Sequence, residues 1–145
     1  MTAQEQIISV LGGAKAVGLK NGKILPFMHE PVRAGIHFAA LEAFQQRYQM
    51  TQAQMQYLID VSERTLARRK AEKILNKSES DRLYRVARIA AMAEEIFGSP
   101  AATAAWFKEQ IPTLGGATPW SLLDTDEGAQ RIAELLGRIE HGVYS

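Results

Sequence analysis

The stretch that ends at Phe97 constrains the fold of this chain most, because its apolar residues recur at helical spacing over several turns. They are Leu83, Val86, Ala87, Ala90, Ala93 and Phe97. Ser78, with Asp81 three residues later, is placed to cap the start of this helix, and Gly98-Ser99-Pro100 provides its end. A helix of this length and polarity predicts the spine of a helical module.

Glycine and proline residues divide the rest of the chain into further helices. We expect helices over the residues that follow a Thr2/Glu5 cap and end at Gly12, and over 32–48, 52–59, 63–75, 101–110, 120–123 and 126–140, with a loop or short strand between Gly18 and Gly35. The predicted fold class is therefore all-α. The expected divisions are an N-terminal helix and loop over 1–31, a central portion over 32–76 and a C-terminal module over 77–145.

Composition narrows the class of protein. The chain has 145 residues, a net charge of +1 and no cysteine, so we expect neither disulfides nor a thiolate zinc site. No apolar run approaches the roughly 20 residues that cross a bilayer, and the first residues lack the pattern of an export signal. These features favour a cytoplasmic protein that does not span the membrane.

Motifs of catalysis are missing from the sequence. The segment Gly12–Gly18 lacks a Lys directly after its last glycine, so a helix end is favoured over a phosphate-binding loop. The three histidines, His29, His37 and His141, have no spacing typical of a metal site. We therefore expect no enzyme activity, no metal and no cofactor.

A helix-turn-helix pattern covers TQAQMQYLIDVSERTLARRK, from Thr51 to Lys70. The second helix would carry Arg64, Arg68, Arg69, Lys70 and Lys73, a concentration of positive charge in a nearly neutral chain. Its N-terminal part would face base edges and its end would face phosphates. The predicted DNA-binding residues are Gln52, Ser62, Glu63, Arg64, Ala67, Arg68, Lys70 and Lys73.

Three residues depart from the usual pattern. Gln56 stands where a small residue normally lets the helices approach, Asp60 stands at the turn position that favours glycine, and Arg69 replaces an apolar residue. Asp tolerates the left-handed conformation better than most residues. The alternative interpretation is a solvated helical pair without a DNA role.

The chain also resembles the Xre/MbcA/ParS family of bacterial antitoxins, the partners of RES-domain toxins. The motifs that carry the resemblance are SERTLARRK at 62–70, ESDRLYRVAR at 79–88, AWF at 105–107, LGGATPWSLLDT at 114–125 and LLGRIEHGVYS at 135–145. They occur in order over 34–145. The resemblance does not extend to the first thirty or so residues.

The resemblance implies an Xre-like helix-turn-helix portion that dimerises and represses its own operon, followed by a toxin-binding module. RES-domain toxins are similar in fold to ADP-ribosyltransferases and deplete cellular NAD. The C-terminal segment of the antitoxin is expected to plug the toxin's active-site cleft, in a complex of higher order than the homodimer. The corresponding toxin-binding residues would be Glu140, His141, Gly142, Val143, Tyr144 and Ser145.

These terminal residues suit such a role, because Gly142 gives backbone freedom and Tyr144 can fill a pocket. A frayed terminus is the alternative for the same residues. Two rival functions also stay open: a dimeric helix-turn-helix transcriptional regulator with no toxin partner, and a toxin binder that has lost DNA binding.

Overall fold

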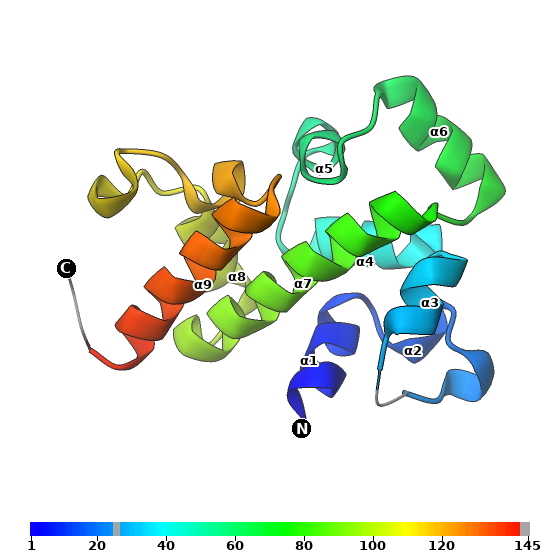
Figure 1. The fold of residues 1–145 in the computed structure, drawn as a ribbon, viewed down its shortest axis with the longest axis horizontal. Helices are drawn as coiled ribbons and strands as arrows, with labels where there is room; N and C mark the ends of the chain where they lie inside the picture. The colour runs from blue at the N-terminus through cyan, green and yellow to red at the C-terminus, as the bar shows by residue number, and fades with distance from the viewer. Residues whose placement is uncertain (25–26, 143–145) are drawn as a thin grey trace.

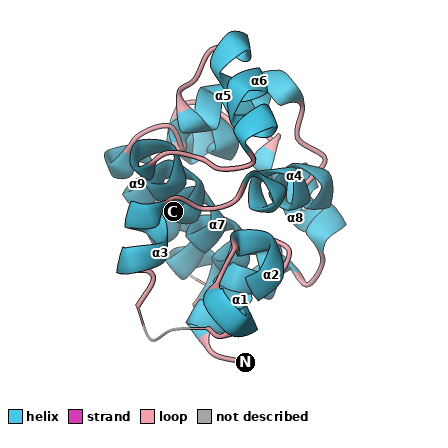
Figure 2. Ribbon diagram, turned by 90° about the vertical axis from the view of Figure 1, so that its right-hand side faces the viewer, coloured by secondary structure: helices cyan, strands magenta, loops and turns pink. Residues whose placement is uncertain are grey.

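The computed structural model describes residues 1–24 and 27–142, and all its regular elements are helical (Figures 1 and 2). The α-helices are α1 (Ala3–Val10), α2 (Ala14–Val17), α3 (His29–Ala34), α4 (Phe38–Arg47), α5 (Gln52–Ile59), α6 (Glu63–Glu72), α7 (Lys77–Phe97), α8 (Pro100–Phe107) and α9 (Asp126–Glu140). The 3-10 helices are η1 (Lys20–Gly22), η2 (Pro112–Leu114) and η3 (Pro119–Leu122). The all-α prediction is confirmed.

Helix α7 is the spine of the molecule and crosses it diagonally in Figure 1. It packs against α1, α3 and α5 as well as against α8 and α9, so both halves of the chain share it. The predicted apolar stripe is its buried face: Leu83, Val86, Ala87, Ala90 and Ala93 are all buried. No helix within the described residues is both long enough and apolar enough to cross a membrane.

The start of α7 differs from the prediction of a Ser78/Asp81 cap. Asn76 is the N-cap, and its side chain accepts a hydrogen bond from the Glu79 backbone N–H at 2.8 Å. In turn, the Glu79 carboxylate accepts a hydrogen bond from the Asn76 backbone N–H at 3.0 Å. The reciprocal pair satisfies two free backbone donors, which explains why Asn76 is preferred over Ser78.

The predicted single helix over 32–48 is wrong, because the chain breaks at Gly35. Gly35 has φ +107°, and a Cβ there would lie 2.4 Å from the Leu75 carbonyl oxygen. The break lets the Ile36 N–H donate to the buried Ser80 hydroxyl at 2.8 Å. Two helices, α3 and α4, therefore replace one, and α3 also occupies part of the predicted loop over 18–35.

Other predicted ends agree closely with the structure. Thr2, Thr51 and Ser62 all cap helices through their side chains, and α9 spans the predicted residues. Helix α6 ends at Glu72 rather than near Leu75, since Lys73 adopts a left-handed conformation with φ 66°. Among the described residues, a single β-bridge, between His37 and Ile74, is the only strand-like pairing.

Candidate nucleic-acid interface and partner surface

Helices α5 and α6 form a helix-turn-helix whose geometry follows from its caps. Thr51 accepts from the Gln54 N–H at 3.1 Å while the Gln54 side chain accepts from the Thr51 N–H at 2.7 Å, which fixes the start of α5. Asp60 ends α5 in the left-handed region, with φ 57° and ψ 58°. Ser62 then caps α6 by accepting from the Thr65 N–H at 3.1 Å. Asp60 therefore supplies the turn for which glycine is usual.

The surface of α6 is almost wholly open, since Leu66 is its only buried residue. All eight predicted DNA-binding residues are exposed: Gln52, Ser62, Glu63, Arg64, Ala67, Arg68, Lys70 and Lys73. Within the described part of the chain, none of the four cations among them has a carboxylate partner within ion-pair distance. This cationic face is free to meet a polyanion, and contact with DNA stays a prediction.

Arg69 has a different environment from its cationic neighbours. Its Nε donates to the Glu79 carboxylate at 2.7 Å, and its Nη1 donates to Glu72 at 3.1 Å. The Glu79 side chain is only 5% exposed. The hydrogen bond to Glu79 is the main reason that the pKa of Arg69 is raised. Arg69, which departs from the usual helix-turn-helix pattern, therefore connects α6 to Glu79 in the cap of α7.

We expect Arg69→Ala to lower the free energy of unfolding by about 2–4 kcal/mol, because it leaves the buried Glu79 carboxylate without its cation. Arg68→Ala, one residue earlier and exposed, is the matched control and should change stability by less than about 0.5 kcal/mol. Urea unfolding of both variants measures the difference. Equal stabilities would show that the Arg69–Glu79 pair does not hold the two helices.

Tyr57 joins the helix-turn-helix to the C-terminal part of the chain. Its hydroxyl donates to the Ser121 carbonyl oxygen at 2.6 Å, and its ring meets Trp120 edge-on at 5.1 Å. Burial, followed by the nearby Asp124 carboxylate, raises the pKa of Tyr57. Gln56, the residue before it, is partly buried rather than packed tightly between the helices. The position of α5 therefore depends on η3.

A second connection runs from α4 to α7. Arg47 Nε donates to the Glu94 carboxylate at 2.9 Å, and the Tyr48 hydroxyl donates to the same oxygen at 2.9 Å. The Arg47 hydrogen bond is the main cause that holds the pKa of Glu94 below its usual range. Burial is the main cause that raises the pKa of Tyr48. No spacing in the sequence signalled these pairs, since Arg47 and Glu94 lie far apart in the chain.

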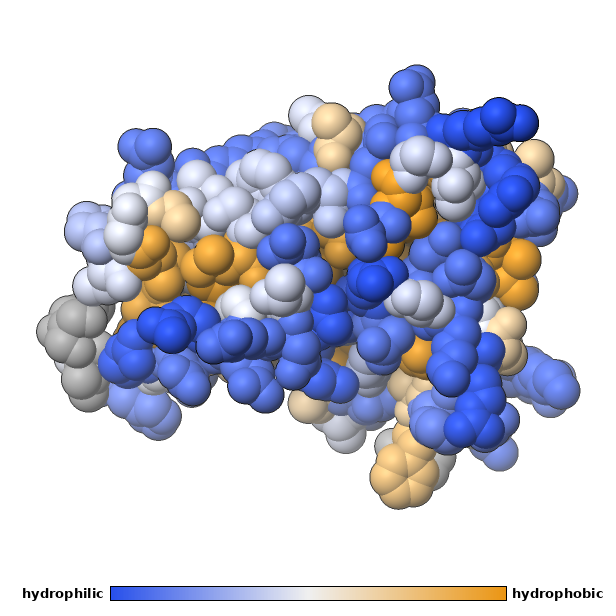
Figure 3. All heavy atoms as spheres, turned by 45° about the horizontal axis from the view of Figure 1, so that its top comes forward, coloured by the Kyte–Doolittle hydropathy of each residue, from blue (hydrophilic) through white to orange (hydrophobic). Residues whose placement is uncertain are grey.

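The predicted toxin-binding residues lie at and beyond the end of α9. Glu140, His141 and Gly142 are exposed, and Gly142 adopts a left-handed backbone conformation with φ +73°. Val143, Tyr144 and Ser145 lie outside the described residues. Figure 3 shows a strip of apolar atoms between polar surfaces on the side of the molecule that carries this end of the chain.

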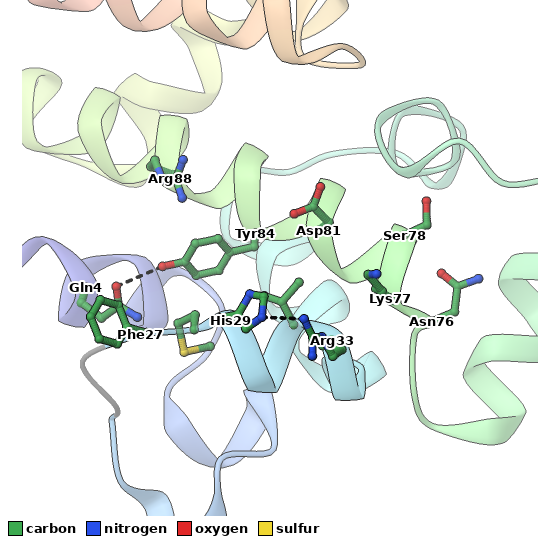
Figure 4. A pocket seen from close by; sticks show the side chains of 12 residues that line it. Gln4, Phe27, His29, Arg33, Asn76, Lys77, Ser78, Asp81, Tyr84 and Arg88 are labelled. Carbon is green, nitrogen blue, oxygen red and sulfur yellow. Dashed lines mark hydrogen bonds between the residues drawn. The ribbon is translucent and has the colours of Figure 1, made fainter.

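A hollow of about 1020 Å³ lies elsewhere, between α1, α3 and α7 (Figure 4). The Tyr84 hydroxyl donates to Gln4 across it at 3.1 Å, and Arg33 donates to His29 at 2.7 Å. Within the described residues, no three His, Asp or Glu side chains gather as a metal site would require. The hollow thus offers polar and aromatic groups without a recognisable catalytic arrangement.

Two family models match the chain, and they meet within α7. The model described as the antitoxin Xre-like helix-turn-helix domain matches residues 27–88. The model described as the antitoxin Xre/MbcA/ParS C-terminal toxin-binding domain matches residues 92–142. The first match contains α5 and α6, and the second contains α8, η2, η3 and α9.

Several curated relatives match parts of the chain. An antitoxin Xre of Yersinia enterocolitica is 37% identical over 87 residues, which are 59% of each chain. An antitoxin Xre of Photorhabdus laumondii is 44% identical over 68 residues, 46% of each chain. A Prs ADP-ribosylating antitoxin of a Sphingobium species is 28% identical over 80 residues, 49% of this chain and 50% of the relative. The chain thus spans about half the length of the relatives it matches.

Proposed function

Since this chain belongs to the Xre/MbcA/ParS family of antitoxins, we propose that it neutralises a RES-domain toxin and represses its own operon. The helix-turn-helix portion would bind operator DNA as a homodimer, and the C-terminal module would bind the toxin. The observation that carries the DNA part is the exposed face of α6, where Arg64, Arg68 and Lys70 have no ion-pair partner within the described residues.

The DNA part of the proposal assigns α6 to the major groove. Arg64 and Arg68 lie one helical turn apart on the exposed face, and either guanidinium can contact a guanine edge through two hydrogen bonds. Gln52 and Lys70 would contact phosphates. A homodimer would present two such helices to half-sites about one DNA turn (~34 Å) apart.

Two substitutions separate base contacts from phosphate contacts. We expect Arg64→Ala to weaken the free energy of operator binding by roughly 1–3 kcal/mol and to relax the sequence preference of the protein, because a base contact is lost. Lys70→Ala should weaken operator and scrambled DNA alike. Titrations by gel shift at several salt concentrations measure both effects. The assignment fails if Arg64→Ala binds operator as tightly and as selectively as the unchanged protein.

The toxin part of the proposal uses the end of α9. Residues 140–145 would enter the toxin's active-site cleft, and the apolar strip that Figure 3 shows between polar surfaces would suit the body of a protein partner. The target would be an enzyme that consumes NAD. Support for this chemistry comes from the Sphingobium relative named a Prs ADP-ribosylating antitoxin, since ADP-ribosylation consumes NAD.

The arrangement of the chain suits two partners at once. In Figure 1, α6 lies at the upper right, whereas α9 ends at Glu140 on the far left. A partner at either end would leave the other end accessible. We therefore propose a complex in which the same antitoxin chain holds toxin and operator together.

Co-expression with an untagged RES-domain toxin tests the proposal. We expect a stable complex on purification and restored cellular NAD. A protein that binds operator but neither captures nor neutralises the toxin would be a plain transcriptional regulator. One that neutralises the toxin but prefers its operator no more than scrambled DNA would be a toxin binder without DNA recognition.

A further inference from the structure

The N-terminal residues before 27 lie outside both family matches, yet they carry an unusual run of positive charge. Between Gly12 and Ile24 the sequence has Lys15, Lys20 and Lys23 and no acidic residue. All three lysines are exposed, and within the described part of the chain none has an ion-pair partner. The helix-turn-helix pattern assigns this cationic segment no role.

Backbone hydrogen bonds hold this segment beside the end of the candidate recognition helix. The His37 N–H donates to the Val17 carbonyl at 3.1 Å, and the next N–H, of Phe38, donates to the Lys73 carbonyl at 3.0 Å. Val17 is the last residue of α2, and Lys73 is the C-cap of α6. Adjacent peptide groups therefore fix both helix ends, since successive Cα atoms are only about 3.8 Å apart.

Close packing leaves this junction little freedom. A Cβ added at Gly18, directly after α2, would lie 2.4 Å from the His37 ring. Leu19 is buried, so it anchors the following 3-10 turn to the core. Lys20 and Lys23 are therefore exposed on a turn that the buried Leu19 holds in place.

Lys20 and Lys23 line the same hollow as Ile74, the residue that follows the C-cap of α6. This hollow of about 470 Å³ is lined by both lysines together with His37 and Ile74. Glu30 also lines it, but its carboxylate lies 3.7 Å from Arg33 Nη1. Because Ile74 directly follows Lys73, the C-cap of α6, the two lysines lie next to the C-terminal end of that helix and would extend its positive surface.

We propose that Lys20 and Lys23 bind phosphates of the DNA backbone next to the place where α6 leaves the major groove. The proposal rests on the DNA binding proposed above and names a second contact surface for it, outside the helix-turn-helix. DNA suits these lysines because a duplex carries one negative charge per roughly 1.7 Å of its axis, so flexible ammonium groups can reach phosphates without exact placement.

Salt-dependent titration of the full chain with operator and scrambled duplexes tests the proposal. Variants Lys20→Ala and Lys23→Ala, alone and together, are compared with Arg131→Ala, which removes one exposed cation from α9. Each lysine variant should make the negative slope of log K against log salt less steep by about 0.9, and should weaken binding to both duplexes roughly eightfold at 0.1 M salt. The double variant should make the slope less steep by about 1.8, and Arg131→Ala should leave it unchanged. Thermal unfolding at an unchanged temperature shows that the fold is intact.

The outcomes separate this proposal from the one it rests on. If the unchanged protein binds operator and scrambled DNA equally, sequence recognition fails, but the slopes still decide the role of the lysines. If the double variant keeps the wild-type slope and affinity, the lysines do not contact DNA and the proposal is overturned. The same holds if the double variant binds DNA normally but loses the toxin, which would assign these lysines to the protein partner. A chain that binds no DNA would overturn both proposals.

Discussion

Gly128→Ala is expected to destabilise the C-terminal module by about 3 kcal/mol or more, because no space exists there for a methyl group. A Cβ at this position would lie 1.8 Å from the Leu122 carbonyl oxygen and 2.8 Å from its carbon. Both are backbone atoms of η3, which cannot move without carrying Trp120 and its contact with Tyr57. Calorimetry should show the unfolding temperature lowered by about 10 °C.

Gly137→Ala, in the same helix, is the matched control. A Cβ at Gly137 would meet no heavy atom within 4 Å, and its backbone is helical. Alanine should therefore stabilise α9 by about 0.5–1 kcal/mol, since it restricts the unfolded chain more than glycine does. If the two substitutions have the same effect, the close approach of α9 to η3 does not decide the stability of the module.

Local patterns were sufficient for much of the fold. The apolar stripe from Leu83 to Phe97 fixed the spine, and Thr51 and Ser62 fixed the starts of the two motif helices, because caps and periodicity act between residues in neighbouring turns. The same rules chose Ser78 over Asn76 as a cap, since both sequences satisfy the capping pattern. In the structure, Asn76 and Glu79 form the reciprocal cap, and Glu79 also accepts a hydrogen bond from Arg69 of α6, a contact that the local pattern does not show.

The remaining errors have one physical origin, which is contact between residues distant in sequence. The helix predicted over 32–48 breaks at Gly35 because the Leu75 carbonyl oxygen approaches there. Arg69 looked anomalous within the motif because its partner Glu79 belongs to the next helix. The candidate DNA residues could be chosen from sequence, since exposure on α6 follows from its period. The junction of α2 with α6 could not be predicted from sequence, because it is formed by hydrogen bonds from the backbone N–H groups of His37 and Phe38.

The charge at Asp60 illustrates how a departure from a motif can be harmless. The residue adopts φ 57° without glycine, and its carboxylate lies 3.8 Å from Arg82 of α7. This pair is largely exposed, so it contributes little to stability. What the turn requires is tolerance of the left-handed backbone, which Asp provides. Neither Asp60 nor Arg69 thus weakens the proposed DNA role, because both side chains are directed to α7.

Removal of Val143, Tyr144 and Ser145 is expected to abolish the proposed toxin neutralisation while leaving the fold and the proposed operator binding unchanged. The described core ends with Leu136 and the partly buried Ile139, so no known packing is lost. A buried aromatic anchor such as Tyr144 commonly carries about 2–4 kcal/mol of binding energy, which corresponds to a roughly 30- to 1000-fold loss of affinity. Cellular NAD during co-expression with a RES-domain toxin, and the thermal unfolding temperature of the purified chain, measure the two halves of this expectation.

Tyr144→Ala at full length separates the aromatic anchor from the length of the tail. If Tyr144→Ala releases the toxin as fully as the truncation does, the Tyr144 ring is the group that blocks the toxin's active site. If only the truncation releases the toxin, other groups of residues 143–145 fill the cleft. A truncated protein that still co-purifies with toxin but no longer restores NAD would separate docking, by the body of the module, from inhibition by the tail. Full neutralisation without these residues would refute insertion of the tail, because Glu140 to Gly142 alone offer no apolar group to exclude a nucleotide from its site.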